Sequence, residues 1–263
     1  MKLLFSETGM SRLAEIARPG LLCAFDFDGT LAPIVKTPSE ARLPDEMREH
    51  LLRLSDYAPV AIITGRSLQD IRERVGFAPD FLIGNHGIEG VPGWESYAAE
   101  HEAQCRSWHA QLADALRNMD PGISLEDKRY SLSVHYRLAH DPAAAFEQLA
   151  AAVARLAPSP RVIEGKFVLN LLAPDARHKG DALVQLMQAS KARSALYIGD
   201  DVTDEDVFRM RRENVLSIRV EHGASSAADF YLPHLRDMTL ALTHVIERLR
   251  STGARNWLEI ATT

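Results

Sequence analysis

Two short apolar segments of this chain each run directly into crowded carboxylates. Residues 21–25 lead into Asp26-Phe27-Asp28-Gly29-Thr30, and residues 195–198 lead into Gly199-Asp200-Asp201-Val202-Thr203-Asp204-Glu205. Acidic side chains at the end of a buried strand repel one another, so a fold tolerates them where a cation or a bound phosphate compensates. Two such clusters at the carboxyl ends of strands predict a Mg²⁺ site for phosphoryl chemistry.

The composition excludes several classes of protein. The chain has 263 residues, 46% hydrophobic and 25% charged, as in ordinary globular proteins. A net charge of -6 without a Lys/Arg block argues against nucleic-acid binding. The apolar runs are too short to span a bilayer, and the start lacks the pattern of a secretory signal. We therefore expect a cytoplasmic monomer with no nucleic-acid and no membrane partner.

The order of apolar and amphipathic segments predicts the fold class. Strands are expected at 21–25, 59–63, 81–83, 195–198, 215–220 and 230–232, with helices beginning near 44, 67, 178, 203 and 237. This alternation is typical of an open, doubly wound α/β parallel sheet. We expect it in residues 1–95 and 177–263.

A block of different character separates these two parts. A helix is expected near 98–118, and Tyr130 to Tyr136 alternate apolar and polar residues like a half-exposed antiparallel strand. Gly165-Lys166 is expected to form the turn of a later hairpin. Residues 96–176 are therefore predicted to be an α+β cap inserted into the core.

The first acidic cluster has the spacing that phosphoester cleavage needs. Asp26 and Asp28, two residues apart, can supply an oxygen nucleophile and an acid from one loop, and Gly29 allows a tight turn. The alternative is that Asp-Gly-Thr is only a turn.

Further polar residues follow other predicted elements. Thr64 ends the second strand and Lys179 opens a helix, where each could bind a phosphoryl oxygen. Asp200, Asp201 and Asp204 offer the carboxylate oxygens that Mg²⁺ prefers. Alone, Thr64 reads as a strand-end cap and Lys179 as a solvated side chain, but the ordered set favours a catalytic site.

These segments resemble the four ordered motifs of the haloacid dehalogenase (HAD) superfamily. More narrowly, DFDGTLAPI, TGRS, GNHGIE, HKGDAL and GDDVTDEDVF resemble trehalose-6-phosphate phosphatases, over nearly the whole chain. The resemblance implies a HAD-like core with a cap, Mg²⁺ as cofactor and a small sugar phosphate as substrate. It implies that Asp26 forms an aspartyl-phosphate, that Asp28 is the acid and then the base, and that Thr64 and Lys179 bind the phosphoryl group. The implied metal residues are Asp26, Asp28 (through its carbonyl), Asp200, Asp201 and Asp204.

The resemblance extends to residues that would contact the sugar. Its E-x-K…HYR pattern falls on Glu126, Lys128 and Arg137, and Lys166 lies on the hairpin. Apart from the resemblance, Arg66 and His86 are further candidate substrate contacts in loops of the core. Arg66 could instead orient the Thr64 loop or cap a strand, and His86 could be a turn residue. Asn170 stands where the family has Glu, which leaves an uncharged group at one expected sugar contact. Without the resemblance, the charges near Lys128 would read as a solvated strand end.

Three functions compete at this stage. The first is a Mg²⁺-dependent phosphatase of trehalose 6-phosphate. The second is a phosphatase of another sugar phosphate, such as glucosyl- or mannosyl-glycerate phosphate or sucrose phosphate, which Asn170 keeps open. The third is a catalytically silent sugar-phosphate sensor, which the presence of Asp26, Asp28 and Asp200 argues against.

Overall fold

The computed structural model describes residues 1–253, which form two compact units. One unit contains Met1–Pro92 and the chain from Arg177 onward, and the other is Gly93–Ala176. The predicted cap, 96–176, begins three residues after the start of the second unit. The last part of the predicted second core segment, 254–263, lies outside the described residues.

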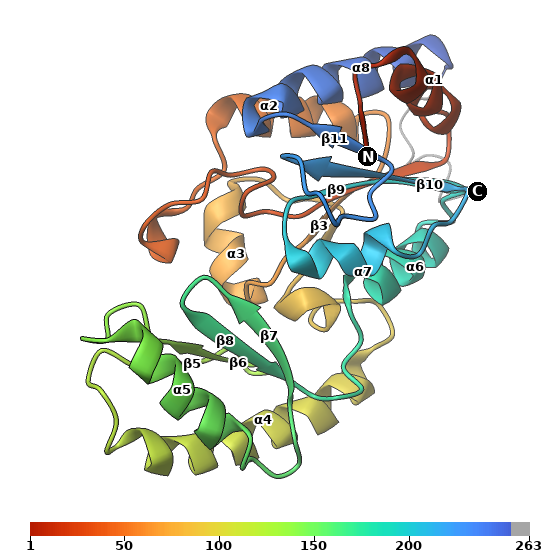
Figure 1. Cartoon of the computed structure of the whole chain (residues 1–263). Coiled ribbons are helices and arrows are strands. Elements are labelled where there is room, and N and C mark those ends of the chain that lie inside the picture. The colour runs from red at the N-terminus through yellow and green to blue at the C-terminus, as the bar shows by residue number, and fades with distance from the viewer. Residues whose placement is uncertain (254–263) are drawn as a thin grey trace. The chain divides into compact units, whose positions relative to one another are not determined.

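The first unit is built on a seven-stranded sheet whose strand pairs are all parallel (Figure 1). Its order is β1-β11-β10-β9-β2-β3-β4. The strands are β1 (Lys2–Leu3), β2 (Leu21–Phe25), β3 (Val60–Ile63), β4 (Phe81–Ile83), β9 (Ser194–Gly199), β10 (Val215–Val220) and β11 (Phe230–Leu232). The predicted doubly wound α/β sheet is confirmed. Only β1 was not predicted, because two residues are too short to show a period.

Helices cover both faces of this sheet (Figure 1). On one side lie α1 (Glu7–Ile16), α2 (Asp45–Ser55) and α8 (Met238–Ser251), and on the other α6 (Lys179–Ala189) and α7 (Glu205–Phe208); α3 (Leu68–Val75) follows β3. Alternate residues of β2, Leu21, Cys23 and Phe25, belong to one buried cluster with α1, α2 and α8. No helix within residues 1–253 is long and apolar enough to cross a membrane.

Two of these helices differ from the sequence prediction. The helix α1 was not predicted. The helix expected from Thr203 is a short 3-10 turn, η3 (Val202–Asp204), that continues into the four residues of α7. The turn is tight because the Asp204 side chain reaches back to accept hydrogen bonds from the backbone amides of Asp200 and Asp201.

The strand order places the two acidic segments beside each other. The chain leaves β2 toward β3 on one side, whereas β9 pairs with β2 on the other, with Phe25 opposite Ile198. Ligands of doubly wound sheets bind where the strand order reverses in this way. Asp26 and Asp200 therefore emerge at the same switch point.

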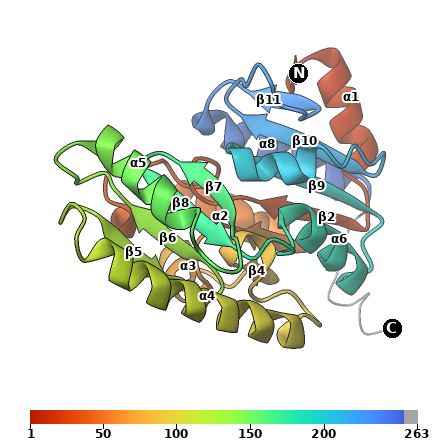
Figure 2. The same cartoon turned by 60° about the horizontal axis from the view of Figure 1, so that its bottom comes forward.

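The second unit is a four-stranded antiparallel sheet with two helices on one face (Figure 2). The strand order is β5-β6-β8-β7. Its elements are α4 (Glu95–Leu116), β5 (Ser124–Asp127), β6 (Leu132–His135), α5 (Pro142–Val153), β7 (Arg161–Gly165) and β8 (Val168–Leu172). The indole nitrogen of the buried Trp108 donates to the carbonyl of Pro158 at 2.6 Å, which ties α4 to the start of β7.

Two local predictions in this unit are wrong. The hairpin turn is Lys166-Phe167, one residue later than predicted, because Gly165 still pairs with Val168 and Phe167 adopts a left-handed φ of 63°. Ser131 and Ser133 are each only 1% exposed, although the alternating pattern predicted a half-exposed strand. The strand β6 is internal to the sheet, and Ser133 lies between Glu126 and Asn170 on its neighbours.

Candidate active site

The loop after β2 brings its carboxylates close to those that follow β9. Asp26 continues the sheet, because its amide donates to the carbonyl of Ile198 at 2.9 Å. Gly29 has a φ of 86°, and a Cβ atom at this position would overlap the carboxylate of Asp200. Only glycine combines this backbone conformation with so close an approach. The glycine therefore permits contact between the two acidic loops.

Lys179 links the two clusters from the first turn of α6. Its ammonium group donates to Oδ1 of Asp26 and to Oδ1 of Asp204, both at 2.8 Å. The lysine is 1% exposed, Asp26 5% and Asp204 0%. Burial would lower the pKa of Lys179, but the charges of Asp204 and Asp26 outweigh it and raise the pKa above its ordinary value. The lysine is therefore a permanent buried cation at neutral pH.

The carboxylate of Asp204 accepts hydrogen bonds from several groups of the site. Besides Lys179, its Oδ1 accepts from the hydroxyl of Tyr197 at 2.6 Å. Its Oδ2 accepts from the amides of Asp200 and Asp201, each at 2.9 Å. A carboxylate has about four acceptor positions, so this one is fully used. Asp204 thus positions Lys179 and the β9 loop.

The remaining carboxylates suit a divalent cation. Carboxylate oxygens of Asp26, Asp200 and Asp204 lie within 4.8 Å of one another. Asp200 accepts from the hydroxyl of Thr30 at 2.9 Å, and burial together with the charge of Asp204 raises the pKa of Asp200 to about 7. Burial also raises the pKa of Asp26, against the opposing effect of Lys179. Three close carboxylates, two buried and one half-buried, with one ammonium leave excess negative charge, which a hard cation would neutralise. This acidic cluster could therefore hold a metal ion, with Asp204 contributing charge and not a free oxygen.

Within the described residues, Asp26 and Asp200 each use only Oδ1 in these hydrogen bonds. Their second oxygens could therefore bind a cation directly, whereas both oxygens of Asp204 already accept hydrogen bonds. The other two predicted metal residues, Asp28 and Asp201, have side chains outside this group of three. Asp201 is exposed, and the carboxylate of Asp28 is bound by Arg66, with bonds of 2.6 and 2.7 Å.

Thr64 and His86 lie in two loops that pack together beside β2. Thr64 is 1% exposed and follows β3, the neighbour of β2. Its carbonyl accepts from the amide of His86 at 2.9 Å, and the His86 ring lies against Gly65. His86 has a left-handed φ of 59°, an uncommon conformation for a residue with a side chain. The backbone thus fixes both loops near the end of β2.

The predicted sugar-contact residues of the second unit gather on one face of its sheet. Glu126 is paired with Ser133 and Ser133 with Asn170, so their side chains project from the same side. The Ser133 hydroxyl donates to Oδ1 of Asn170 at 2.6 Å. Lys128 approaches Glu126 at 3.9 Å. Nη2 of Arg137 donates to the carbonyl of Lys166 at 3.3 Å, which brings these two residues together at the hairpin.

Sequence reasoning missed three residues that support the site. They are Thr30, which bonds Asp200; Tyr197, which bonds Asp204; and Glu89, whose carboxylate accepts from the Leu68 amide at 2.7 Å and from Asn85 at 2.9 Å. Tyr197 carries a weak signal, because a tyrosine inside a buried strand needs a partner for its hydroxyl. Its identity as a partner of Asp204 depends on a turn that the sequence does not specify.

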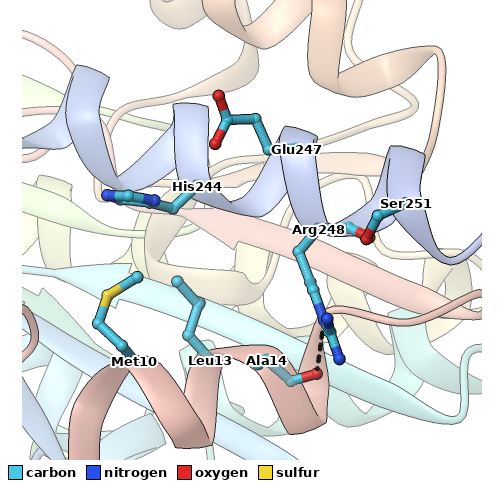
Figure 3. A pocket seen from close by; sticks show the side chains of 7 residues that line it. All are labelled: Met10, Leu13, Ala14, His244, Glu247, Arg248 and Ser251. Carbon is cyan, nitrogen blue, oxygen red and sulfur yellow. Dashed lines mark hydrogen bonds between the residues drawn. The ribbon is translucent and has the colours of Figure 1, made fainter. Parts of the chain in front are cut away.

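A separate hollow of about 260 Å³ lies between α1 and α8 (Figure 3). It is lined by Met10, Leu13, Ala14, His244, Glu247, Arg248 and Ser251. Arg248 crosses it to donate to the carbonyl of Ala14 at 3.3 Å (Figure 3). None of the candidate catalytic residues lines this hollow, which lies in the helical layer on one face of the sheet.

The sequence matches a family model described as trehalose-phosphatase over residues 24–233. Among curated proteins, the chain is 32% identical over 207 residues to trehalose-phosphate phosphatase of Mycobacterium tuberculosis, covering 75% of this chain and 53% of that protein. It is 38% identical over 241 residues to an uncharacterized glycosyl hydrolase of the same species, covering 85% of this chain and 18% of that protein. The chain therefore spans about a fifth to a half of the curated relatives it matches.

Solved structures show the same fold at low sequence identity. A trehalose-6-phosphate phosphatase related protein superposes with a TM-score of 0.70 at 20% identity, covering 92% of this chain and all of that one. The trehalose-6-phosphate phosphatase of Aspergillus fumigatus gives a TM-score of 0.64 at 24% identity, covering 94% and 99%. These likenesses show that the chain shares the fold of these solved structures.

Proposed function

Because the chain belongs to the trehalose-phosphatase family, we propose that it hydrolyses trehalose 6-phosphate to trehalose and inorganic phosphate. The observation that carries this proposal is the environment of Asp26. Asp26 is only 5% exposed, and its carboxylate emerges at the switch point of the sheet, where Lys179 donates to it at 2.8 Å. An oriented carboxylate beside a buried ammonium can attack a phosphoryl group whose charge that ammonium helps to stabilise.

The chemistry follows from the positions of the two carboxylates in the β2 loop. Asp26 attacks phosphorus, the bond from phosphorus to the sugar oxygen breaks, and Asp28 gives its proton to that oxygen. Asp28 then takes a proton from water as the water oxygen attacks the aspartyl-phosphate, which releases phosphate and restores Asp26. Thr64, which follows the neighbouring strand β3, would donate to a phosphoryl oxygen.

Magnesium is the cofactor that the acidic residues favour. Asp26 and Asp200 would hold it through carboxylate oxygens and the loop of Asp28 through a carbonyl, with Asp201 exposed nearby to orient bound water. When bound, Mg²⁺ would neutralise charge on the transferring phosphoryl group. Asp204 would act indirectly, by fixing Lys179 and the amides of Asp200 and Asp201.

We further propose that residues 96–176 are the cap that selects the substrate. Glu126, Lys128 and Asn170 share a polar sheet face, and Arg137 and Lys166 meet at the hairpin, so several donors and acceptors are available for sugar hydroxyls. Changing Lys128 to Ala should cripple hydrolysis of trehalose 6-phosphate but spare p-nitrophenyl phosphate, which lacks those hydroxyls.

A phosphate-release screen tests the function directly. Trehalose 6-phosphate, sucrose phosphate and glucosyl- and mannosyl-glycerate phosphates are each supplied with Mg²⁺ and with chelator. Asp26→Asn serves as the control, because an amide of equal size cannot attack phosphorus. If another sugar phosphate is hydrolysed faster, that compound would replace trehalose 6-phosphate as the proposed substrate. Asn170, which stands where the family has Glu, makes this a specific alternative. A wild-type chain that hydrolyses none of them would favour the silent sensor.

A further inference from the structure

The carboxylate of Asp28 is gripped at both oxygens by one arginine. Nε of Arg66 donates to Oδ2 at 2.6 Å, and Nη2 donates to Oδ1 at 2.7 Å. Such two-bond forks between guanidinium and carboxylate are stronger and more directional than single hydrogen bonds. The Arg66 side chain is only 12% exposed, whereas that of Asp28 is 37% exposed. Arg66 therefore orients the Asp28 carboxylate from the protein side, while part of the Asp28 side chain remains exposed.

Arg66 is itself fixed by a chain of alternating charges along α3. Its Nη1 donates to Oδ2 of Asp70 at 2.6 Å, and the same oxygen accepts from Nε of Arg74 at 2.8 Å. A second bond joins Nη2 of Arg74 to Oδ1 of Asp70. Burial alone would raise the pKa of Asp70, but the hydrogen bonds from Arg74 and Arg66 lower it to about 2. Asp70 thus remains an anion that anchors Arg66 at every ordinary pH.

The same two arginines reach the segment that follows the β2 loop. Nη2 of Arg66 donates to the carbonyl of Pro38 at 3.0 Å, and Nη1 of Arg74 to the carbonyl of Ser39 at 2.6 Å. Pro38 and Ser39 belong to the short 3-10 helix η1 (Pro38–Glu40). Asp28, η1 and the start of α3 are therefore joined in one network.

We propose that Arg66 is a positioning residue for Asp28, and that Oδ1 is the oxygen of Asp28 that exchanges the proton. This inference rests on the proposed phosphatase function. An aspartate on a turn can adopt several rotamers, yet its proton must reach one leaving oxygen. When Oδ1 turns to the substrate, Oδ2 keeps its bond to Nε, and Nη2 keeps its bond to Pro38. The fork thus allows one oxygen to leave while the other still fixes the side chain.

A direct contact between Arg66 and the substrate is less favourable in this geometry. Its Nε, Nη1 and Nη2 all donate to protein oxygens, on Asp28, Asp70 and Pro38. Binding a phosphate or sugar would break these bonds. The role inferred here therefore differs from the substrate contact that the sequence suggested for Arg66.

A double-mutant cycle separates these roles. Asp28→Ala, Arg66→Gln and the double variant are compared with wild type on p-nitrophenyl phosphate and trehalose 6-phosphate with Mg²⁺. Arg66→Gln should lower kcat by about tenfold to a hundredfold and leave KM within about threefold. Asp28→Ala should lower kcat by roughly a hundredfold or more, the usual worth of a general acid–base. Since Arg66 acts through Asp28, the double variant should match Asp28→Ala within about twofold.

Two further variants complete the design. Arg66→Lys keeps the charge but cannot form the fork, so it should recover little of the lost kcat and also serves if Arg66→Gln folds poorly. Arg72→Gln removes an exposed arginine of the same helix and should match wild type.

Each outcome decides the proposal. Equal fold-losses from Arg66→Gln in the wild-type and Asp28→Ala backgrounds would overturn it and indicate a structural role. A rise in KM with unchanged kcat would overturn it in favour of substrate binding. A wild-type protein that is active on p-nitrophenyl phosphate but not on trehalose 6-phosphate would leave the cycle interpretable and reject only the substrate. Inactivity on both would reject the phosphatase function and this inference with it.

Discussion

Replacing Lys179 with Met would leave two buried carboxylates facing each other without a cation. The lysine donates at 2.8 Å to both Asp26 and Asp204, and all three side chains are almost fully buried. Removing one partner of a buried ion pair costs about 3–5 kcal/mol, because the remaining charge stays out of water. We expect a loss of this size in the free energy of unfolding at about pH 8 without metal, and loss of nearly all turnover.

The loss should depend on pH with a definite sign. In the wild type the pKa of Lys179 is raised, so its stabilisation is fully present below the ordinary lysine value and constant from about pH 5 to 8. In the variant, burial raises the pKa of Asp26 without the opposing effect of Lys179. At low pH, Asp26 of the folded variant therefore holds a proton. The stabilisation that this proton provides is lost as the pH rises through the raised pKa. The destabilisation should therefore be smaller at about pH 5 than at pH 8.

Urea unfolding of chelator-treated protein at the two pH values measures this difference, with the exposed Lys191→Met as control. Added Mg²⁺ should recover part of the stability at pH 8, because it supplies positive charge to the same carboxylates. A destabilisation below about 1 kcal/mol, equal to that of the control and independent of pH, would refute the reasoning that Lys179 neutralises this cluster.

Three other predictions follow from the same contacts. The pKa of Asp200 is raised to about 7, so protons should compete with Mg²⁺ for this carboxylate. Magnesium titrations should show the apparent Mg²⁺ affinity weakening by up to about tenfold per pH unit below 7. An affinity that does not change with pH would contradict this prediction. Tyr197→Phe should cost about 1.5–3 kcal/mol in urea unfolding, since a hydrogen bond to a charged group is lost, whereas Tyr57→Phe should cost little. Asn170→Glu should leave kcat/KM on trehalose 6-phosphate intact or improve it by up to about tenfold, on the order of 1 kcal/mol.

The strands of the core could be predicted because each carries its own signal. The segments 215–220 and 230–232 have the predicted bounds, since each is a short, mainly apolar segment between polar turns. The element β1 pairs with β11 through only Lys2 and Leu3, and so short a pairing depends on the rest of the sheet. The hairpin turn was misplaced because Gly165 favours turns in general, while here Phe167 takes the left-handed position.

The candidate site could be predicted as a set of residues but not as a set of contacts. The ends of β2 and β9 were expected to meet, since carboxyl ends of parallel strands share one edge of the sheet. The hydrogen bonds that give each carboxylate a different role could not be predicted from the sequence. Asp204 is saturated by Lys179, Tyr197 and two amides, and Asp28 is held by Arg66. These bonds depend on side-chain directions that appear only when loops distant in sequence pack together.

The environment of Asn170 explains how this chain can depart from its family there and makes Asn170→Glu informative. Oδ1 of Asn170 accepts from the Ser133 hydroxyl at 2.6 Å, and Nδ2 donates to the carbonyl of Ile163 at 3.4 Å. Glu is one methylene longer than Asn, but its carboxylate can also accept a hydrogen bond from a hydroxyl. The bond to Ile163 that it cannot make is long, so the exchange should cost little stability. Glu126 lies two strands away, at roughly 10 Å, where repulsion is weak near solvent. Folding thus places little constraint on the choice between Asn and Glu, and the ligand becomes the deciding factor. If Asn170→Glu keeps its stability but loses activity on trehalose 6-phosphate and on the preferred sugar phosphate of the screen, Asn170 is adapted to a different ligand, and the substrate assignment fails while the phosphatase chemistry stands.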